Sequence, residues 1–145
     1  MPKVSIIIVS FNVRSYLVSA IDSILKSNYS NYEIIVVDNN SYDNTVDIVS
    51  DKYPKVNIIS NDENVGFGKA VNQGAKIASG DYFLILNPDT IIEEDMIIDL
   101  IEYIESNKKI GMVGPKILNS DDLLRLSTKG FRGEALSSIG SVSKM

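Results

Sequence analysis

Cysteine and histidine are both absent from this sequence of 145 residues. Without cysteine the chain can form neither disulfide bonds nor thiolate metal sites, which fits a reducing compartment, and we expect a cytoplasmic location. Without histidine, catalysis by a Ser-His or Cys-His pair and metal sites built on imidazole are excluded. Proton transfer and metal binding in this chain therefore depend on carboxylates.

Basic residues and long apolar runs are also scarce. Fourteen Lys and Arg stand against nineteen Asp and Glu, which gives a net charge of -5. The longest basic run is Lys108-Lys109, so the chain would repel duplex nucleic acid and we expect no nucleic-acid partner. The apolar stretch from Val4 to Val9 is too short for a signal peptide or a membrane span.

Short apolar runs of strand length alternate with segments whose apolar residues have helical spacing. The runs are Val4 to Val9, Glu33 to Val37, Val56 to Ile59, Tyr82 to Leu86 and Ile110 to Val113. The helical segments between them contain Val13 to Ile24, Val46 to Val49, Phe67 to Ala78 and Met96 to Ile104. This alternation predicts an α/β domain with a mainly parallel sheet flanked by helices on both faces.

The pattern weakens after Pro115. The remaining stretch is polar, with three glycines and several serines and without a clear period. We therefore place the domain at residues 1–118 and expect residues 119–145 to include a flexible tail.

Polar residues follow the first four apolar runs. In open α/β sheets, ligands bind at the carboxyl ends of the strands, so these positions are candidates for a binding site. They are Ser10 to Asn12, Asp38 to Ser41, Asn61 to Asn64 and Asn87 to Thr90. Taken singly, Asn12, Ser41 and Asp62 are more typical of ordinary turn and helix-cap residues.

Asp38 has three possible roles. It could accept hydrogen bonds from ribose hydroxyls or a base N–H, or it could cap the turn that follows, and position alone does not separate these two roles. A phospho-acceptor of a receiver domain also lies at a strand end, but such a domain needs an acidic pair after its first strand. Ser10-Phe11-Asn12 does not supply that pair.

Two further segments contain residues that could bind a metal ion or an anion. Pro88 ends the fourth run and leaves the Asp89 carboxylate in a tight turn, where it could bind Mg²⁺ or Mn²⁺ beside a diphosphate or cap the helix that begins near Glu93. The glycines Gly66 and Gly68 could let backbone N–H groups approach an anion. Their spacing matches neither the dinucleotide fingerprint nor the nucleoside-triphosphate loop.

In combination, these motifs resemble the family 2 glycosyltransferases over roughly Lys3 to Leu118. The matching segments are Val4 to Asn12, Ile35 to Ser41, Glu63 to Phe67 and Leu86 to Thr90. Asn87-Pro88-Asp89-Thr90 and the later Val113-Gly114-Pro115-Lys116 look most like the rhamnosyltransferase-type branch. The resemblance implies a GT-A (Rossmann-like) fold that transfers a sugar, with inversion, from a UDP- or dTDP-sugar to a hydroxyl acceptor.

The resemblance also implies roles for single residues. Asp38 would contact the nucleoside, and Asp89 would bind the divalent metal, Mg²⁺ or Mn²⁺, that bridges the donor diphosphate. Asn87 stands where the family usually has a second acid, so we expect a weaker metal site. The remaining residues that would line or support the nucleotide pocket are Ser10, Asn12, Asn64, Gly66, Phe67 and Asn72.

No general base is recognised. Asp121, Asp122 and Glu134 are available, but surface turn residues are the better interpretation of all three. Residues 119–145 are then an incomplete acceptor-side segment or a flexible tail, and the alternative function is a fragment that binds the donor without transferring sugar. The resemblance further implies a glycan or lipid-linked acceptor, a role in cell-surface polysaccharide synthesis, and peripheral association with the inner face of the membrane through that acceptor.

Overall fold

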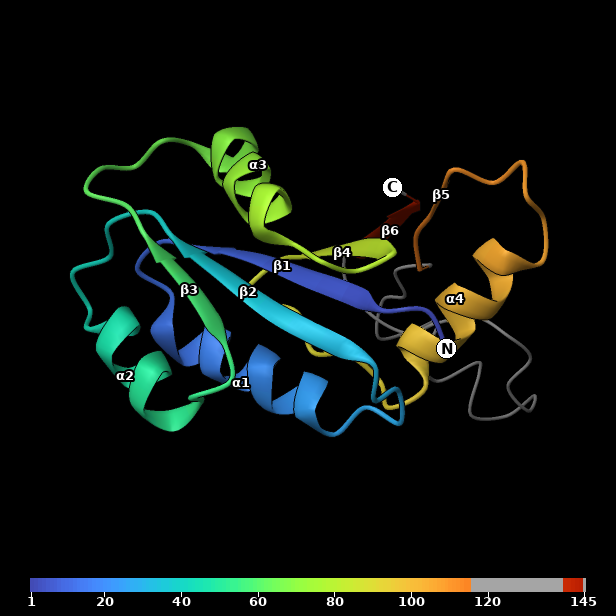
Figure 1. Cartoon of the computed structure of the whole chain (residues 1–145). Coiled ribbons are helices and arrows are strands. Elements are labelled where there is room, and N and C mark those ends of the chain that lie inside the picture. Colours follow the sequence, from blue (N-terminus) through green and yellow to red (C-terminus); the bar gives the residue numbers. More distant parts are fainter. Residues whose placement is uncertain (116–139, 145) are drawn as a thin grey trace, which may run out of the picture.

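The computed structural model describes residues 1–115 and 140–144, which contain a six-stranded sheet (Figure 1). Across the sheet the strand order is β3-β2-β1-β4-β6-β5. The strands are β1 (Val4–Ser10), β2 (Tyr32–Asp38), β3 (Asn57–Ser60), β4 (Tyr82–Leu86), β5 (Met112–Val113) and β6 (Gly140–Lys144). The first four strands run parallel, and β6 is antiparallel to both of its neighbours.

β1 is the central strand of the parallel part, because it pairs with β2 on one side and with β4 on the other. Ile6, Ile7 and Ile8 have no exposed surface, so β1 is buried on both faces of the sheet. A continuous run of β-branched residues suits such a strand, because both rows of side chains can pack against helices.

Helices cover both faces (Figure 1). α1 (Arg14–Leu25), α2 (Thr45–Lys52) and α4 (Met96–Glu105) supply one face and share a core with Ile6 and Ile8. α3 (Phe67–Ile77) lies on the opposite face, where Ala70 packs with Ile7 and Ile35. The arrangement confirms the expected α/β fold with a mainly parallel sheet and helices on both faces.

The structure describes two short strands at the carboxyl end of the chain. β5 is only two residues long, and β6, which comes from the segment 119–145, lies between β5 and β4. Glycines and serines have weak strand propensity, but pairing with β4 over its full length, from Leu86 opposite Gly140 to Tyr82 opposite Lys144, compensates for it. Asp121, Asp122 and Glu134 lie outside the described residues, and the boundary at residue 118 stays a prediction.

The described residues contain no helix that is long and apolar enough to cross a membrane.

Candidate functional site

Ser10 and Asp38 are paired in register at the carboxyl ends of β1 and β2. Ser10 lies two residues after Ile8 and Asp38 two residues after Val36, so both side chains are on the sheet face that α1 and α2 cover. Both residues are buried, and the Asn39 N–H donates to the Ser10 carbonyl at 2.8 Å. The structure therefore brings these two predicted residues side by side.

The Asp38 carboxylate holds the turn that follows β2. One oxygen accepts the Ser41 N–H at 2.8 Å and the other accepts the Ser41 hydroxyl at 2.6 Å. This geometry establishes the turn-capping role. A carboxylate has about four acceptor positions, so capping leaves lone pairs for a ligand, and nucleoside contact by Asp38 stays a prediction.

The Ser10 hydroxyl has no hydrogen-bond partner among the described residues, although its residue is fully buried. An unpaired buried polar group costs about 1–3 kcal/mol, so folded proteins rarely keep one without a reason. The Ser10 hydroxyl is therefore a buried, unpaired group beside Asp38, and contact between it and a nucleotide stays a prediction.

Asn12 joins the loop after β1 to the loop after β2. Its N–H donates to the Ser41 hydroxyl oxygen at 2.9 Å, and its side-chain oxygen accepts the Tyr42 N–H at 2.9 Å. The backbone of Asn12 has a φ of 52°, a left-handed conformation that asparagine tolerates better than most residues. Asn12 therefore shapes the site by tying two loops together.

Asp43 is a residue of this site that the sequence interpretation missed. Its carboxylate accepts the Arg14 N–H at 3.0 Å, and its carbonyl accepts the Arg14 guanidinium at 2.7 Å. Burial raises the pKa of the Asp43 carboxyl, but hydrogen bonds from the Thr45 hydroxyl and from backbone N–H groups outweigh it, so the pKa lies below its usual value. The position of this acidic residue just before the start of α2 was the sequence signal that could have identified it.

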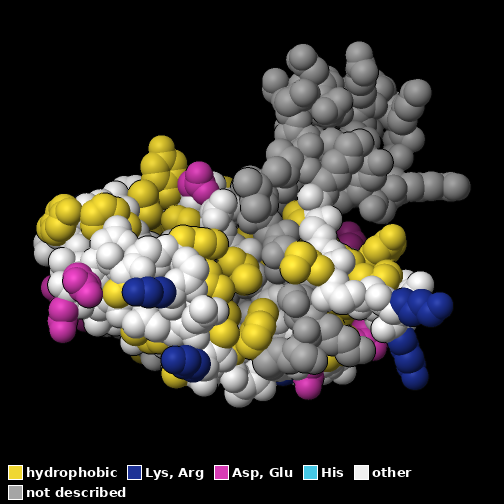
Figure 2. Space-filling view, turned by 90° about the horizontal axis from the view of Figure 1, so that it is seen from above, with side chains coloured by type: hydrophobic (Ala, Val, Ile, Leu, Met, Phe, Trp, Pro, Cys, Tyr) yellow, Lys and Arg dark blue, Asp and Glu magenta, His cyan; other side chains and the backbone are white. Residues whose placement is uncertain are grey.

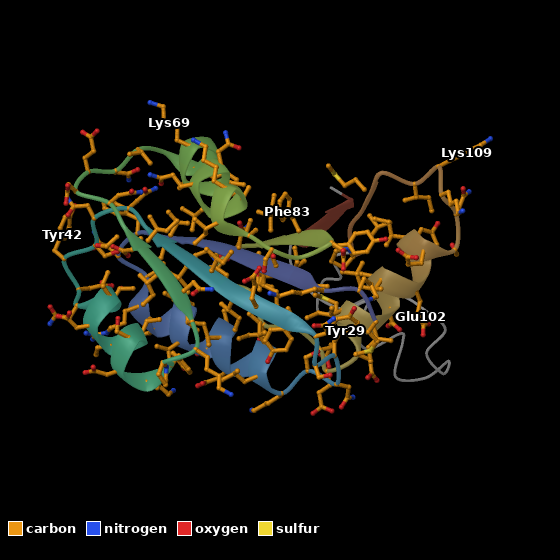
Figure 3. The ribbon with its side chains drawn as sticks, in the orientation of Figure 1. Tyr29, Tyr42, Lys69, Phe83, Glu102 and Lys109 are labelled. Carbon is orange, nitrogen blue, oxygen red and sulfur yellow. The ribbon has the colours of Figure 1, made fainter. Side chains whose placement is uncertain are left out.

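An aromatic pair stands at the outer edge of these two loops. Phe11 and Tyr42 meet edge to face with ring centroids 5.8 Å apart, and their exposed fractions are 39% and 77%. Figure 3 shows Tyr42 on the outside of the loop after β2. The pair gives the rim of the site an exposed apolar surface.

The loop from β3 to α3 contains the predicted residues Asn64, Gly66 and Phe67. The Asn64 side-chain oxygen accepts the Gly66 N–H at 2.9 Å, so that N–H is used within the turn. Gly66 has a φ of 84°, a conformation that requires glycine, and Phe67 begins α3 with 55% of its surface exposed. The Gly66 N–H is therefore not free to donate to an anion, and what Gly66 contributes to the loop is its backbone conformation.

Amide side chains connect this loop to the end of β2. The Asn39 amide donates to the Gly66 carbonyl at 3.5 Å, and the Asn61 amide donates to the Asn39 oxygen at 3.0 Å. Asn61 and Gln73 exchange two further hydrogen bonds of 2.8 and 2.9 Å. Asn39 lies in the predicted polar stretch Asp38 to Ser41, whereas Gln73 was not predicted, because a single amide has no distinctive spacing.

Asn72 lies farther along α3, on its exposed side. It lines a shallow cavity of about 280 Å³ together with Val65, Lys69, Gln73 and Lys76. Lys69 points away from the sheet in Figure 3. The structure therefore places Asn72 on the helix surface and shows no contact between it and Ser10 or Asp38.

The face that α3 covers is mostly uncharged. Figure 2 shows apolar side chains spread across this face, with a few acidic and basic side chains among them. Phe67 and Ile77, at the two ends of α3, are each more than half exposed.

Asn87 and Asp89 follow β4, on the opposite side of β1 from Asp38. The Thr90 N–H donates to the Asn87 carbonyl at 3.1 Å, which closes the turn, and Asp89 is exposed within it. Because β2 and β4 both adjoin β1, they are separated by two strand spacings, roughly 9–10 Å. A nucleoside diphosphate is long enough to extend from one strand end to the other.

Few side chains after β4 could serve as ligands for a metal ion. The described residues contain no group of three or more acidic, histidine or cysteine side chains that could hold an ion. Among these residues, no side chain or N–H donates to the Asp89 carboxylate, so its oxygens are available. One free carboxylate fits Mg²⁺ or Mn²⁺ that takes most of its ligands from phosphates and water.

A larger cavity, of about 460 Å³, lies at the opposite edge of the sheet. It is lined by residues at the starts of β2 and β3 and the ends of α1 and α2, including Tyr32, Val56, Leu25 and Lys52. None of the predicted site residues lines it. Since ligands of open α/β sheets bind at the carboxyl edge, we place the functional site at Ser10 and Asp38.

Comparison with known proteins identifies the family. The model for the family described as glycosyl transferase family 2 matches residues 5–136, most of the chain. The chain belongs to glycosyltransferase family 2. The match includes each predicted site residue and extends beyond residue 118.

Two similar proteins come from Staphylococcus species. This chain is 31% identical over 125 residues to a poly-beta-1,6-N-acetyl-D-glucosamine synthase of Staphylococcus epidermidis. The aligned stretch covers 83% of this chain and 30% of the relative. The chain also matches the S. aureus TarS structure with UDP-GlcNAc at a TM-score of 0.71 and 26% identity, over 81% of this chain and 36% of the other.

A third similarity supports the fold alone. A mannosyltransferase of Pyrobaculum calidifontis, in complex with GDP-Man and Mn²⁺, matches with a TM-score of 0.78 at 21% identity, over 99% of this chain and 44% of the other. This likeness confirms the GT-A fold. The chain spans only 30%, 36% and 38% of the length of three curated relatives that it matches.

Proposed function

We propose that this chain binds a nucleoside diphosphate sugar at the carboxyl edge of its sheet and supplies the donor side of an inverting glycosyl transfer. The observation that carries the proposal is the placement of Ser10, Asp38 and Asp89 at the ends of three adjacent strands. Membership of glycosyltransferase family 2 supports the reaction class. The acceptor would be a hydroxyl of a glycan or of a lipid-linked sugar.

The residues present suggest how the donor would lie. Asp38 and Ser10 would bind the nucleoside, and the loop at Asn64 to Phe67 would flank it. Asp89 would hold Mg²⁺ or Mn²⁺ against the diphosphate, with neutral Asn87 as its neighbour. When bound, the metal neutralises charge on the diphosphate leaving group.

The donor is proposed to be a UDP- or dTDP-sugar. The TarS structure contains UDP-GlcNAc, which supports a pyrimidine nucleotide, whereas the mannosyltransferase structure contains GDP-Man. The Asn87-Pro88-Asp89-Thr90 motif favours a rhamnosyltransferase-like member. A lipid-linked acceptor would bring the protein to the inner face of the membrane for cell-surface polysaccharide synthesis, which the name of the Staphylococcus relative supports.

A thermal-shift panel tests donor binding. UDP, dTDP, GDP and their sugars are each added with Mn²⁺ and, separately, with EDTA. A ligand at about 100 times its dissociation constant adds roughly 2.7 kcal/mol to the free energy of unfolding, so the correct nucleotide raises the melting temperature by several degrees. If no nucleotide changes the melting temperature in either condition, the proposal is wrong.

Binding without transfer is the second candidate function. It is favoured by the sequence motifs, because those that were recognised belong to the donor side and no general base is recognised among them. In that case the nucleotide panel gives the same result, and only an assay of sugar transfer separates the two functions.

A further inference from the structure

Residues 87–95 connect β4 to α4 and carry Asp89. Thr90 is fully buried and Ile92 is 5% exposed, whereas Asp89 and Ile91 face solvent. Side chains from Asp89 to Ile92 therefore alternate between solvent and the core. The segment nevertheless contains neither helix nor strand. Such an irregular segment needs hydrogen bonds from elsewhere to keep one conformation.

The first such hydrogen bond comes from α1. The Ser23 hydroxyl accepts the Ile92 N–H at 3.1 Å and donates to the Ala20 carbonyl at 2.7 Å. Ser23 is 8% exposed, and Ile92 belongs to the same core cluster as Ile21 and Ile24. Ser23 thus fixes the backbone three residues after Asp89.

A second group of hydrogen bonds comes from the loop after α1. The Glu94 carbonyl accepts the Asn28 N–H at 2.9 Å and the Ser27 hydroxyl at 3.1 Å. The Asn28 amide also donates to the Asp95 carboxylate at 2.7 Å. The far end of the segment is therefore held at Glu94 and Asp95, just before α4 begins.

We propose that Ser23 and Asn28 are positioning residues that set the place of Asp89 at the carboxyl edge of the sheet. The proposal rests on the proposed function, in which Asp89 holds the metal of the donor complex. β4 anchors the segment before Asp89, and Ser23 and Asn28 anchor it after. Because metal-mediated contacts depend on the placement of each ligand, loosening one anchor weakens them without changing Asp89 itself.

The test compares the full chain with Ser23→Ala, Asn28→Ala and the control Ser19→Ala. Ser19 lies one turn earlier on α1 and is exposed, and its hydroxyl donates to the Ser15 carbonyl of the same helix at 3.1 Å. UDP affinity is measured by calorimetry with Mn²⁺ and with EDTA. In Ser23→Ala and Asn28→Ala we expect UDP affinity with Mn²⁺ to fall on the order of tenfold, which is equivalent to about one hydrogen bond. We expect UDP affinity with EDTA to stay unchanged.

Hydrogen exchange gives a readout that does not depend on nucleotide. We expect faster exchange of the amides in residues 90–95 in Ser23→Ala and Asn28→Ala than in wild type, and no change in Ser19→Ala. Unchanged exchange in both site variants overturns the positioning role. If wild type gains no UDP affinity from Mn²⁺, the metal part of the proposed function fails, and the exchange data still decide whether these residues hold the segment.

Discussion

At the scale of single residues, Ser41 connects Asp38 to Asn12 through hydrogen bonds. Its hydroxyl donates to Asp38 and accepts the N–H of Asn12, while its own N–H donates to Asp38. Asp38 consequently has a structural role together with its proposed role in nucleoside binding. The Ser10 hydroxyl beside it has no hydrogen-bond partner among the described residues.

Replacement of Asp38 tests both roles. Asp38→Ala removes the proposed nucleoside acceptor, and we expect affinity for UDP or dTDP to fall by about 1–3 kcal/mol. The same change leaves the Ser41 N–H without its acceptor, so the melting temperature also falls. Calorimetric titration measures affinity, and Ser41→Ala serves as the control because it loosens the turn and keeps the carboxylate. If Asp38→Ala binds UDP as tightly as the control does, Asp38 has no part in the pocket.

Asp89 differs from Asp38 because it is exposed and none of the described residues donates to it. We therefore expect Asp89→Asn to abolish the nucleotide affinity that Mn²⁺ adds, while metal-free binding and stability change little, within about 0.5 kcal/mol. Titrations with Mn²⁺ and with EDTA measure the two effects. An equal loss in both conditions would mean that Asp89 shapes its turn and binds no ion.

At the scale of elements, α3 approaches the sheet closely at one glycine. A Cβ added at Gly74 would lie 2.7 Å from Ile7 Cγ2 and 3.4 Å from Val37 Cγ2. The absence of a side chain lets the helix lie against β1 and β2. The close approach also keeps the Asn61–Gln73 hydrogen bonds, and with them the loop at Gly66, close to the end of β2.

Two glycine substitutions in α3 should have opposite effects. Gly74→Ala forces Ile7 or α3 to move, and we expect the free energy of unfolding to fall by about 1–3 kcal/mol despite the better helix propensity. Gly68→Ala meets nothing within 4 Å, so propensity alone applies and stability rises by up to about 1 kcal/mol. Urea unfolding of both variants measures the difference. A stabilising Gly74→Ala would contradict this account of helix packing.

At the scale of the whole molecule, the four parallel strands bring their four polar strand ends to one edge of the sheet. The end of β1 lies between the ends of β2 and β4, so residues 38 and 89 come from either side of the same strand. The opposite edge, at the amino ends of the strands, contains hydrogen bonds and an ion pair within the protein. There Glu33 accepts hydrogen bonds from Ser5 at 2.6 Å and from the Ser79 N–H at 2.7 Å, and it lies 3.5 Å from the Lys3 ammonium group.

Transfer activity is a prediction about the whole chain. We expect the 145 residues to bind the donor nucleotide but to transfer sugar poorly, because no general base is recognisable and base assistance contributes about 10²–10⁴-fold. Slow hydrolysis of the donor can remain. Product analysis with several nucleotide sugars and hydroxyl acceptors, beside a full-length relative, measures the difference. Rapid turnover by this chain would contradict the prediction and direct attention to Asp121, Asp122 and Glu134.

Local pattern was sufficient for the fold class and for the strand ends. The run from Val4 to Val9 is apolar throughout because a central parallel strand is buried on both faces, and the polar residues after it begin where that burial ends. Asp38 and Asp89 were therefore predictable as residues of one sheet edge. The family resemblance supplied their proposed roles, which composition and spacing alone left open.

Other features depend on contacts between residues far apart in the sequence. Asp43 meets Arg14 across 29 positions and Ser23 meets Ile92 across 69, and neither pair has a local pattern. β6 forms from a glycine- and serine-containing stretch because the edge of β4 offers it a complete set of pairings. The sequence by itself determined which segments are buried and where polar groups emerge, because burial follows local hydrophobic pattern. Only the tertiary structure decided which of those polar groups meet, because hydrogen bonds depend on the relative placement of whole elements.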